Sequence, residues 1–187
     1  MTESSEMAHV NRLATNELTV EEIAEIRGLM LVAFADDENG AFTDDDWEHS
    51  IGGTHFVLRD AGRIICHASV VERDLHVDGK PLRTGYVEAV ATLPELQGRG
   101  FGTAVMREVN DLIATEFDLG ALGTGSHHFY ERLGWQVWRG QTFVRTDGGL
   151  QRTPDEEGDI LVLSTPRTPA LDLGQTLSCE WRPGDVW

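Results

Sequence analysis

The sequence predicts an α/β or α+β layer fold in which a mixed, mostly antiparallel sheet is flanked by helices. Runs with strand character alternate with runs whose apolar residues recur at helical spacing. Two turn sequences, Asp60-Ala-Gly62 and Asp78-Gly79, join consecutive strand-like runs in the manner of antiparallel hairpins. The chain has 187 residues, with neither an internal repeat nor a low-complexity linker, so we expect one domain, 1–187.

The first half of the chain predicts two helices among five strands. His9–Ala14 has the pattern of a short strand. Thr19-Val-Glu-Glu22 is a capping box that opens a helix reaching Ala33, and Thr43 is expected to cap a short helix through Trp47. The other strands are expected at 55–59, 63–71, 74–77 and from 82 to about 93, where Pro94 ends ladder pairing.

The second half predicts two more helices between shorter strands. Apolar residues at helical spacing mark a helix over 101–117, and a short helix over 126–133 should end at Gly134. The polar stretch Gly148–Gly158, which contains Pro154, is expected to be a loop. Strands are expected at 119–122, 135–144, 160–163 and 171–181.

The charge balance is strongly acidic and bears on the kind of partner. Asp and Glu total 32 against 15 Lys and Arg, a net charge of −17, which argues against nucleic acid and against an anionic membrane surface. An acidic surface attracts cationic ligands, although it also serves solubility. Three acidic groups lie in expected loops or helix starts: Asp36-Asp-Glu38, Asp44-Asp-Asp46 and Asp155-Glu-Glu157. Binding residues collect in such places, but carboxylates there also cap helices.

Targeting signals and metal motifs are not found in the sequence. It contains no apolar run of about 18 residues, and its first residues lack the basic and apolar regions of a secretory signal. Cys66 and Cys179, the only cysteines, form no CxxC pair and no Cys/His cluster with metal-ligand spacing. We therefore expect no metal site, a cytoplasmic location, and buried cysteines that act as small apolar residues.

The segment Glu95-Leu-Gln-Gly-Arg-Gly-Phe-Gly102 is the most informative stretch of the chain. It joins a strand-like run to a helical run, so its backbone N–H groups and the positive end of a helix dipole can face one anion. It fits neither a Walker loop, which needs a Lys, nor the Gly-x-Gly-x-x-Gly dinucleotide fingerprint. The segment predicts a pyrophosphate site; the alternative is a glycine-rich helix start that binds nothing.

Five motifs together resemble one enzyme family. The run Gln97-Gly-Arg-Gly-Phe-Gly102 resembles the Gln/Arg-x-x-Gly-x-Gly/Ala signature of GNAT N-acetyltransferases, whose loop holds the pyrophosphate of acetyl-coenzyme A. The terminal Gly-Asp-Val-Trp is the most specific motif, because general GNAT domains do not carry it. The motifs that resemble the aminoglycoside 2'-N-acetyltransferases are Asp46-Trp-Glu-His-Ser-Ile-Gly-Gly53, Gly85-Tyr-Val-Glu-Ala-Val-Ala91, Arg152-Thr-Pro-Asp155 and Cys179-Glu-Trp-Arg-Pro-Gly-Asp-Val-Trp187.

This resemblance implies a GNAT-type fold and direct transfer of acetyl from acetyl-CoA to the 2'-amino group of aminoglycosides, which confers resistance. Glu88 would act as the base through a water, and Tyr130 as the acid for the leaving thiolate; the alternatives are an outward-facing strand residue and a core tyrosine. The pKa of Glu88 must then rise from its usual value of about 4.3. The cofactor-binding residues implied are Val90, Ala91, Thr92, Gln97, Gly98, Arg99, Gly100, Phe101 and Gly102.

In this family the strand before the loop separates from its neighbour near Val90, where a freed N–H would hold the thioester carbonyl. The acceptor would be a cationic small molecule bound by acidic groups and by the chain end. Three departures put the drug preference in doubt: the loop at 36–41 looks longer, Gly123 stands where relatives can have Ser, and Glu156 where they can have Asp. The acceptor-binding residues implied are Asp37, Asp46, Glu88, Ala89, Gly123, Asp155, Glu156, Asp185 and Trp187.

Two other functions remain open at the level of sequence. One is a GNAT enzyme that acetylates another polyamine or an aminosugar metabolite. The other is a non-catalytic module that binds acyl-CoA, which the presence of both Glu88 and Tyr130 disfavours. A homodimer is also possible, since enzymes of this kind often pair.

Overall fold

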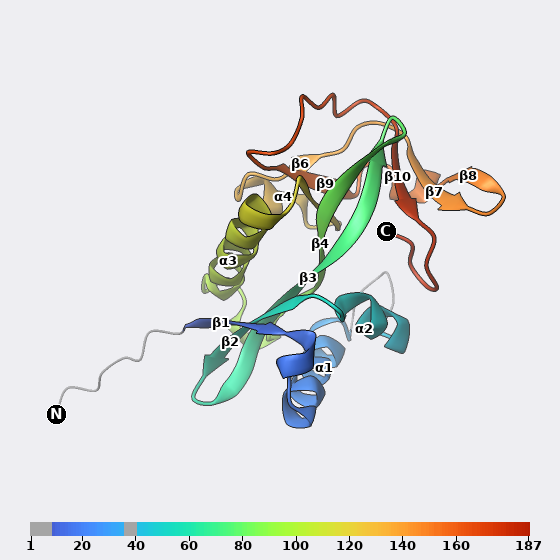
Figure 1. The fold of residues 1–187 in the computed structure, drawn as a ribbon. Coiled ribbons are helices and arrows are strands. Elements are labelled where there is room, and N and C mark those ends of the chain that lie inside the picture. The colour runs from blue at the N-terminus through green and yellow to red at the C-terminus, as the bar shows by residue number, and fades with distance from the viewer. Residues whose placement is uncertain (1–8, 36–40) are drawn as a thin grey trace.

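The computed structural model of the protein describes residues 9–35 and 41–187 and contains one ten-stranded sheet (Figure 1). Its strands are β1 (Val10–Ala14), β2 (Thr54–Asp60), β3 (Arg63–Val77), β4 (Lys80–Thr92), β5 (Leu119–Gly123), β6 (Gln136–Val137), β7 (Thr142–Thr146), β8 (Gly149–Arg152), β9 (Ile160–Ser164) and β10 (Leu177–Glu180). The helices are α1 (Val20–Ala33), α2 (Asp44–Ser50), α3 (Phe101–Glu116) and α4 (His127–Glu131), with 3-10 turns η1 (Thr15–Glu17), η2 (Pro94–Leu96) and η3 (Pro154–Glu156).

The sheet is mixed and mostly antiparallel, as the sequence predicts. Its order is β6-β9-β5-β4-β3-β10-β7-β8, and β2 joins the first half of β3 and carries β1 on its other edge. The pairs β4–β5 and β7–β10 are parallel, and the other pairs are antiparallel. The predicted fold class is confirmed.

A long hairpin of β3 and β4 forms the centre of the sheet. Its turn, Asp78-Gly79, has positive φ angles of 48° and 76°, which match the twist of a tight hairpin. The prediction of two separate strands at 63–71 and 74–77 was wrong. Glu72 and Arg73 continue the ladder with β4, and these polar residues are accommodated by ion pairs to Arg83 and Glu180.

Helices cover the hairpin from both sides. Figure 1 shows α3 on one side of it and α1 with α2 on the other, and both α1 and α3 contact β3 and β4. Thr19 caps α1 and Thr43 caps α2 as predicted, although α2 continues three residues past Trp47. The predicted apolar face of α3 is buried through Val105, Met106, Val109, Leu112 and Ile113.

Three predictions for the last third of the chain were wrong in detail. The expected strand at 135–144 is broken into β6, which pairs with β9, and β7, which pairs with β10. Between them Gly140 packs against the backbone of Gln175. The expected loop at 148–158 contains β8 and η3, since β8 pairs with β7. Only Leu177–Glu180 of the expected strand at 171–181 joins the sheet.

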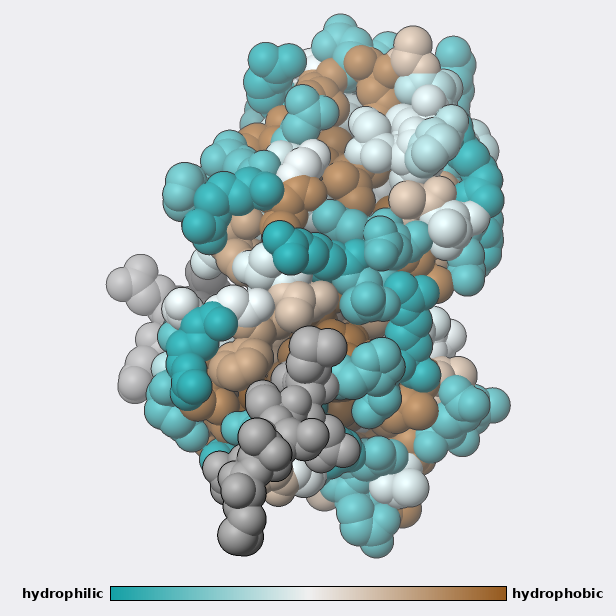
Figure 2. All heavy atoms as spheres, turned by 90° about the vertical axis from the view of Figure 1, so that its left-hand side faces the viewer, coloured by the Kyte–Doolittle hydropathy of each residue, from teal (hydrophilic) through white to brown (hydrophobic). Residues whose placement is uncertain are grey.

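Two apolar clusters form the core, one beneath α1 and α3 and one under β10. Cys66 and Cys179 are fully buried and free, which confirms the predicted burial, and the terminal Trp187 is buried in the second cluster. On the face that carries α3, hydrophilic and hydrophobic side chains alternate (Figure 2). None of the helices in the described residues is both long and apolar enough to cross a membrane.

Gly140 provides a test of the crossing between β6 and β7. A Cβ there would lie 1.7 Å from the carbonyl oxygen of Gln175, so Gly140→Ala should lower the free energy of unfolding by roughly 1–3 kcal/mol. Gly28→Ala is the control: no atom lies within 4 Å of its Cβ in α1, and it should raise that free energy by roughly 0.5–1 kcal/mol. Equal effects of the two substitutions in denaturant unfolding would contradict this packing.

Candidate active site

A bulge in β4 lies at the centre of the candidate site. Ser69 of β3 pairs with Glu88 and His67 pairs with Ala91, so Ala89 and Val90 together oppose a single residue of β3. Ala89 has a φ of 50°, a left-handed conformation that residues other than glycine rarely adopt. Strained backbone of this kind is concentrated at functional sites.

The neighbouring strand separates from β4 just before this bulge. The parallel ladder between β4 and β5 runs only from Thr84 to Tyr86, opposite Leu119–Ala121. The separation predicted near Val90 is therefore present and begins after Tyr86. It leaves the β5 side of Glu88–Thr92 outside the β4–β5 ladder.

Glu88 is held in a mostly buried ion pair. Its side chain is 16% exposed, and Nη1 of Arg182 donates a hydrogen bond of 2.6 Å to its Oε1. Burial raises the pKa of Glu88 to about 7, while Arg182 acts in the opposite direction. The alternative of an outward-facing strand residue is wrong, and the carboxyl can exchange a proton near neutral pH.

One carboxylate, Asp185, lies within electrostatic reach of Glu88, and a second, Glu156, lies within reach of Asp185. Asp185 raises the pKa of Glu88, after burial and in opposition to Arg182, and so lies within electrostatic reach of it. Burial raises the pKa of Glu156 in η3, and the negative charge of Asp185 raises it further. Asp155 is exposed on the same turn. Asp185 thus links the carboxylates of β4 and η3 in one acidic cluster.

The C-terminal segment folds back after β10 and is fixed by Arg182. The Arg182 guanidinium donates to the carbonyl oxygen of Asp185 (2.7 Å) and to a carboxyl oxygen of Trp187 (3.0 Å) as well as to Glu88. The Trp187 indole donates to Oγ1 of Thr153 at 2.9 Å, and its backbone N–H donates to Oδ1 of Asp185 at 3.0 Å. The end of the chain is therefore held beside the catalytic candidate.

Helix α2 contacts this segment, but its Asp46 carboxylate is already engaged. The ring of His49 donates to the carbonyl of Pro183 at 2.7 Å. Asp46 accepts hydrogen bonds of 2.7 Å from the N–H and hydroxyl of Thr43 and so caps the helix. Asp46, which the sequence resemblance gives as an acceptor ligand, therefore lies on the helix that contacts the terminal segment, with one carboxylate oxygen already hydrogen-bonded. Asp37 lies outside the described residues.

Gly123 lies at the end of β5 next to Tyr86 and the chain terminus. A Cβ at Gly123 would lie 3.6 Å from the Tyr86 hydroxyl and 3.9 Å from the carboxyl carbon of Trp187. The Tyr86 hydroxyl is buried, and no hydrogen-bond partner is found for it among the described residues. The absence of a side chain at Gly123 thus leaves room beside two polar groups.

Two of the three glycines of the loop have a left-handed backbone. Gly98 and Gly100 have φ angles of 72° and 90°, both are exposed, and Gly100 directly precedes α3. Beyond the adjacent residues, no atom of residues 9–35 and 41–187 lies within 4 Å of a Cβ at either position, so the backbone is open to a ligand. Gly102 is helical instead and packs against Phe129 and Thr92, because α4 closes on the start of α3.

The remaining loop residues tie the loop to the strand end. The Gln97 side chain donates to the carbonyl of Thr92 at 3.3 Å, and the Arg99 guanidinium lies over the ring of Phe101. This loop thus adjoins the stretch 90–92 named as cofactor-binding. An extended, glycine-opened backbone beside a helix start is suited to the pyrophosphate of acetyl-CoA.

Tyr130 lies in α4, packed edge-on against Phe129 and Trp135. Burial raises the pKa of its phenol above the usual range, and Cys66 raises it further. The phenol is therefore protonated at neutral pH. Its packing is that of a core tyrosine, and it is also in the protonation state that an acid needs.

The comparisons with known proteins agree with this geometry. The sequence matches the family model of an acetyltransferase (GNAT) domain over residues 14–138. It is 38% identical to the aminoglycoside 2'-N-acetyltransferase of Mycolicibacterium fortuitum over 184 residues, which cover 96% of this chain and 92% of that one. The chain belongs to the GNAT acetyltransferases, in the aminoglycoside 2'-N-acetyltransferase family.

Solved GNAT structures share the fold at low sequence identity. YhbS of Escherichia coli, solved with CoA, is 17% identical with a TM-score of 0.63 over 94% of this chain and 89% of that one. A GNAT acetyltransferase of Brucella melitensis, solved with acetyl-CoA, is 17% identical with a TM-score of 0.54 over 82% and 95% of the two chains. At these identities the likeness concerns the fold alone.

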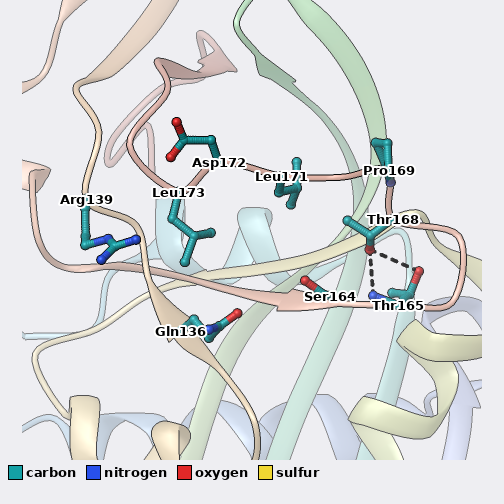
Figure 3. Close-up of a pocket in the computed structure, with 9 residues that line it drawn as sticks. All are labelled: Gln136, Arg139, Ser164, Thr165, Thr168, Pro169, Leu171, Asp172 and Leu173. Atoms are coloured by element: carbon teal, nitrogen blue, oxygen red, sulfur yellow. Dashed lines mark hydrogen bonds between the residues drawn. The ribbon is translucent and has the colours of Figure 1, made fainter.

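A separate hollow of about 310 Å³ in this GNAT enzyme lies away from the candidate site (Figure 3). It is lined by β6, the end of β9 and the loop that follows, including Gln136, Ser164 and Leu173. Ser164 pairs with Leu119 at the start of β5, whereas Gly123 and the acidic cluster lie at its other end. The hollow is therefore not part of the acetyltransferase site.

The two buried cysteines are unsuited to nucleophilic catalysis. Burial raises the pKa of Cys66 and of Cys179 to about 11, so neither thiol is ionised near neutral pH. Among residues 9–35 and 41–187, no group of three or more His, Cys, Asp or Glu side chains is arranged to hold a metal ion.

Arg182 is the residue of this GNAT site that sequence reasoning missed. It lies inside the quoted terminal motif, between Trp181 and Pro183, and a cation there gave no signal by itself. The signal that could have found it was its setting: Arg182 is a basic residue among acidic candidate ligands, and such a residue needs an acidic partner. Which carboxylate it pairs with depends on the fold, since 94 residues separate it from Glu88.

Arg182→Gln should release the C-terminal segment, because one guanidinium holds Glu88, Asp185 and Trp187 together. Loss of such charge-assisted hydrogen bonds should lower local stability by roughly 1–3 kcal/mol and speed amide exchange over residues 184–187. Arg152→Gln, which removes the more exposed pair with Glu157, is the control and should leave that exchange unchanged. Unchanged exchange in both variants would contradict the anchoring role.

Proposed function

We propose that this GNAT enzyme transfers acetyl from acetyl-CoA to the 2'-amino group of aminoglycosides and so confers resistance. The observation that carries the proposal is the acidic cluster of Glu88, Glu156 and Asp185, which gathers beside the buried terminal Trp187. The M. fortuitum relative, which bears this activity in its name, supports the choice of acceptor. The proposal keeps residues 1–187 as one catalytic domain in the cytoplasm, with a homodimer possible.

Acceptor binding would rest on charge. An aminoglycoside carries several ammonium groups, and a charge-assisted hydrogen bond contributes roughly 1.5–3 kcal/mol, so a few such bonds decide affinity. Glu156, Asp185, the exposed Asp155 and the α-carboxylate of Trp187 would take these groups. Asp46 would contribute through its second oxygen, and the space at Gly123, next to Ala89, would admit part of the sugar.

Donor binding would use the last residues of β4 and the loop that follows them. Acetyl-CoA supplies the acetyl group as a thioester. Gln97, Gly98, Arg99, Gly100, Phe101 and Gly102 would hold its pyrophosphate at the start of α3, where the backbone is open. Backbone groups of Val90, Ala91 and Thr92, beyond the end of the β4–β5 ladder, would bind the arm that carries the thioester.

Two protons must move during transfer. The acceptor ammonium must lose a proton before it attacks, and Glu88, whose pKa of about 7 matches neutral conditions, would take it through a water. The thiolate that leaves must gain one, and Tyr130 would donate it. Because burial raises the pKa of Tyr130, its contribution depends on position more than on acidity.

A second candidate is acetylation of another polyamine or of an aminosugar metabolite. The observation that favours it is the cluster itself, since carboxylates bind any polycation. The departures at Gly123 and Glu156 lie in this acceptor region and leave the donor loop untouched.

The regiochemistry of the product tests the proposal most directly. With an aminoglycoside that bears a 2'-amine, NMR of the product should show a single acetyl group on that nitrogen, and an analogue with a 2'-hydroxyl should release no coenzyme A. Glu88→Gln should slow turnover by roughly 10²–10⁴-fold, the usual contribution of a general base.

Two other outcomes would favour other functions. Acetylation at another nitrogen, or faster turnover of spermidine-like polyamines, would favour the second candidate. CoA binding without turnover would favour a non-catalytic module.

A further inference from the structure

Two buried histidines that the acetyl-transfer steps do not use lie directly behind the bulge. His55 of β2 and His67 of β3 are both fully buried. Nδ1 of His55 lies 3.0 Å from Nε2 of His67, and Nδ1 of His67 lies 2.8 Å from the carbonyl oxygen of Ala89. A continuous polar chain therefore ends on the strained residue of β4.

The direction of each hydrogen bond in this chain follows from its end. A carbonyl oxygen can only accept, so Nδ1 of His67 carries a hydrogen, and because burial keeps the ring neutral, Nε2 carries the lone pair. Nδ1 of His55 must then donate to that lone pair, which leaves Nε2 of His55 to accept from the Thr15 hydroxyl at 2.9 Å. Thr15 in turn accepts from the N–H of Gly52 at 2.9 Å.

The same assignment requires both rings to be neutral. Burial lowers the pKa of His55 to about 4 and that of His67 to about 3, so neither ring titrates near neutral pH. The two groups that contact the His67 ring, the His55 ring and the carbonyl of Ala89, are likewise uncharged. The chain is thus a fixed set of donors and acceptors and not a source of protons.

The bulge needs such a partner. A non-glycine residue in the left-handed region is disfavoured by contacts of its Cβ, and a carbonyl withdrawn from water is costly to leave without a donor. Residues at a bulge lose regular ladder partners, and β3 supplies side chains in their place. The Ser69 hydroxyl donates to the carbonyl of Glu88 at 3.3 Å, and the His67 ring donates to that of Ala89.

We propose that His67 is a positioning residue for acetyl transfer, which holds the Ala89 bulge, and that His55 and Thr15 fix its ring. The bulge sets the direction of the Glu88 side chain on one side and of the Val90 N–H on the other, so both depend on this one hydrogen bond. The inference rests on the proposed role of Glu88 but not on the identity of the acceptor.

Two near-isosteric substitutions of His67 separate this role from simple core packing. The amide nitrogen of Asn can take the place of Nδ1 and donate to Ala89, whereas that of Gln takes the place of Nε2 and faces His55. His67→Asn should therefore keep most of the wild-type kcat. His67→Gln should lose on the order of tenfold or more, because misplaced catalytic groups can cost up to about a hundredfold. His76→Gln, farther along β3, is the control and should match wild type.

Nitrogen-15 NMR of the histidine rings detects this series of hydrogen bonds directly and needs no acceptor substrate. In the intact protein both His55 and His67 should be Nδ1–H tautomers, unchanged between about pH 5 and 8. An Nε2–H or charged His67, or equal losses of kcat in the Asn and Gln variants, would overturn the proposal. Failure to acetylate any aminoglycoside would overturn the proposed acceptor alone, since the tautomers and the kcat ratio with another amine remain measurable.

Discussion

The ion pair between Glu88 and Arg182 is the interaction on which the candidate site depends. It joins the middle of the sheet to a segment 94 residues away, and both side chains are largely withdrawn from solvent at 16% and 13% exposure. Two opposing effects meet at Glu88. Burial disfavours its charge and Arg182 favours it, and the balance brings its pKa to about 7. A carboxyl in water would be almost entirely ionised at that pH.

The same arginine organises the proposed acceptor region. Its other hydrogen bonds hold the carbonyl of Asp185 and the carboxyl of Trp187, so the catalytic candidate and the chain terminus share one anchor. Helix α2 and η3 then contact the terminal segment through Pro183 and the indole of Trp187. The proposed donor loop is built separately, by η2 and the start of α3.

Features set by a few neighbouring residues could be read from the sequence. The Asp78-Gly79 hairpin, the caps at Thr19 and Thr43, and the left-handed Gly98 and Gly100 each depend on local backbone chemistry. Features set by distant partners could not. The unbroken ladder through Glu72–Arg73 needs Arg83 and Glu180, the break at Gly140 needs Gln175, and the partner of Arg182 is on β4. The packing of Gly102 depends on a distant partner too, since Phe129 comes from α4.

Direct titration of Glu88 tests the central claim that burial and Arg182 together set its proton affinity. Carbon-13 NMR of glutamate-labelled protein, with Glu88→Gln to assign the signal, should give a midpoint near pH 7, and Arg182→Gln should move it upward because a favourable positive charge is lost. Activity should rise with pH through the same midpoint, since only the unprotonated carboxylate accepts a proton. A midpoint near the ordinary value of about 4.3, unmoved by Arg182→Gln, would contradict the account.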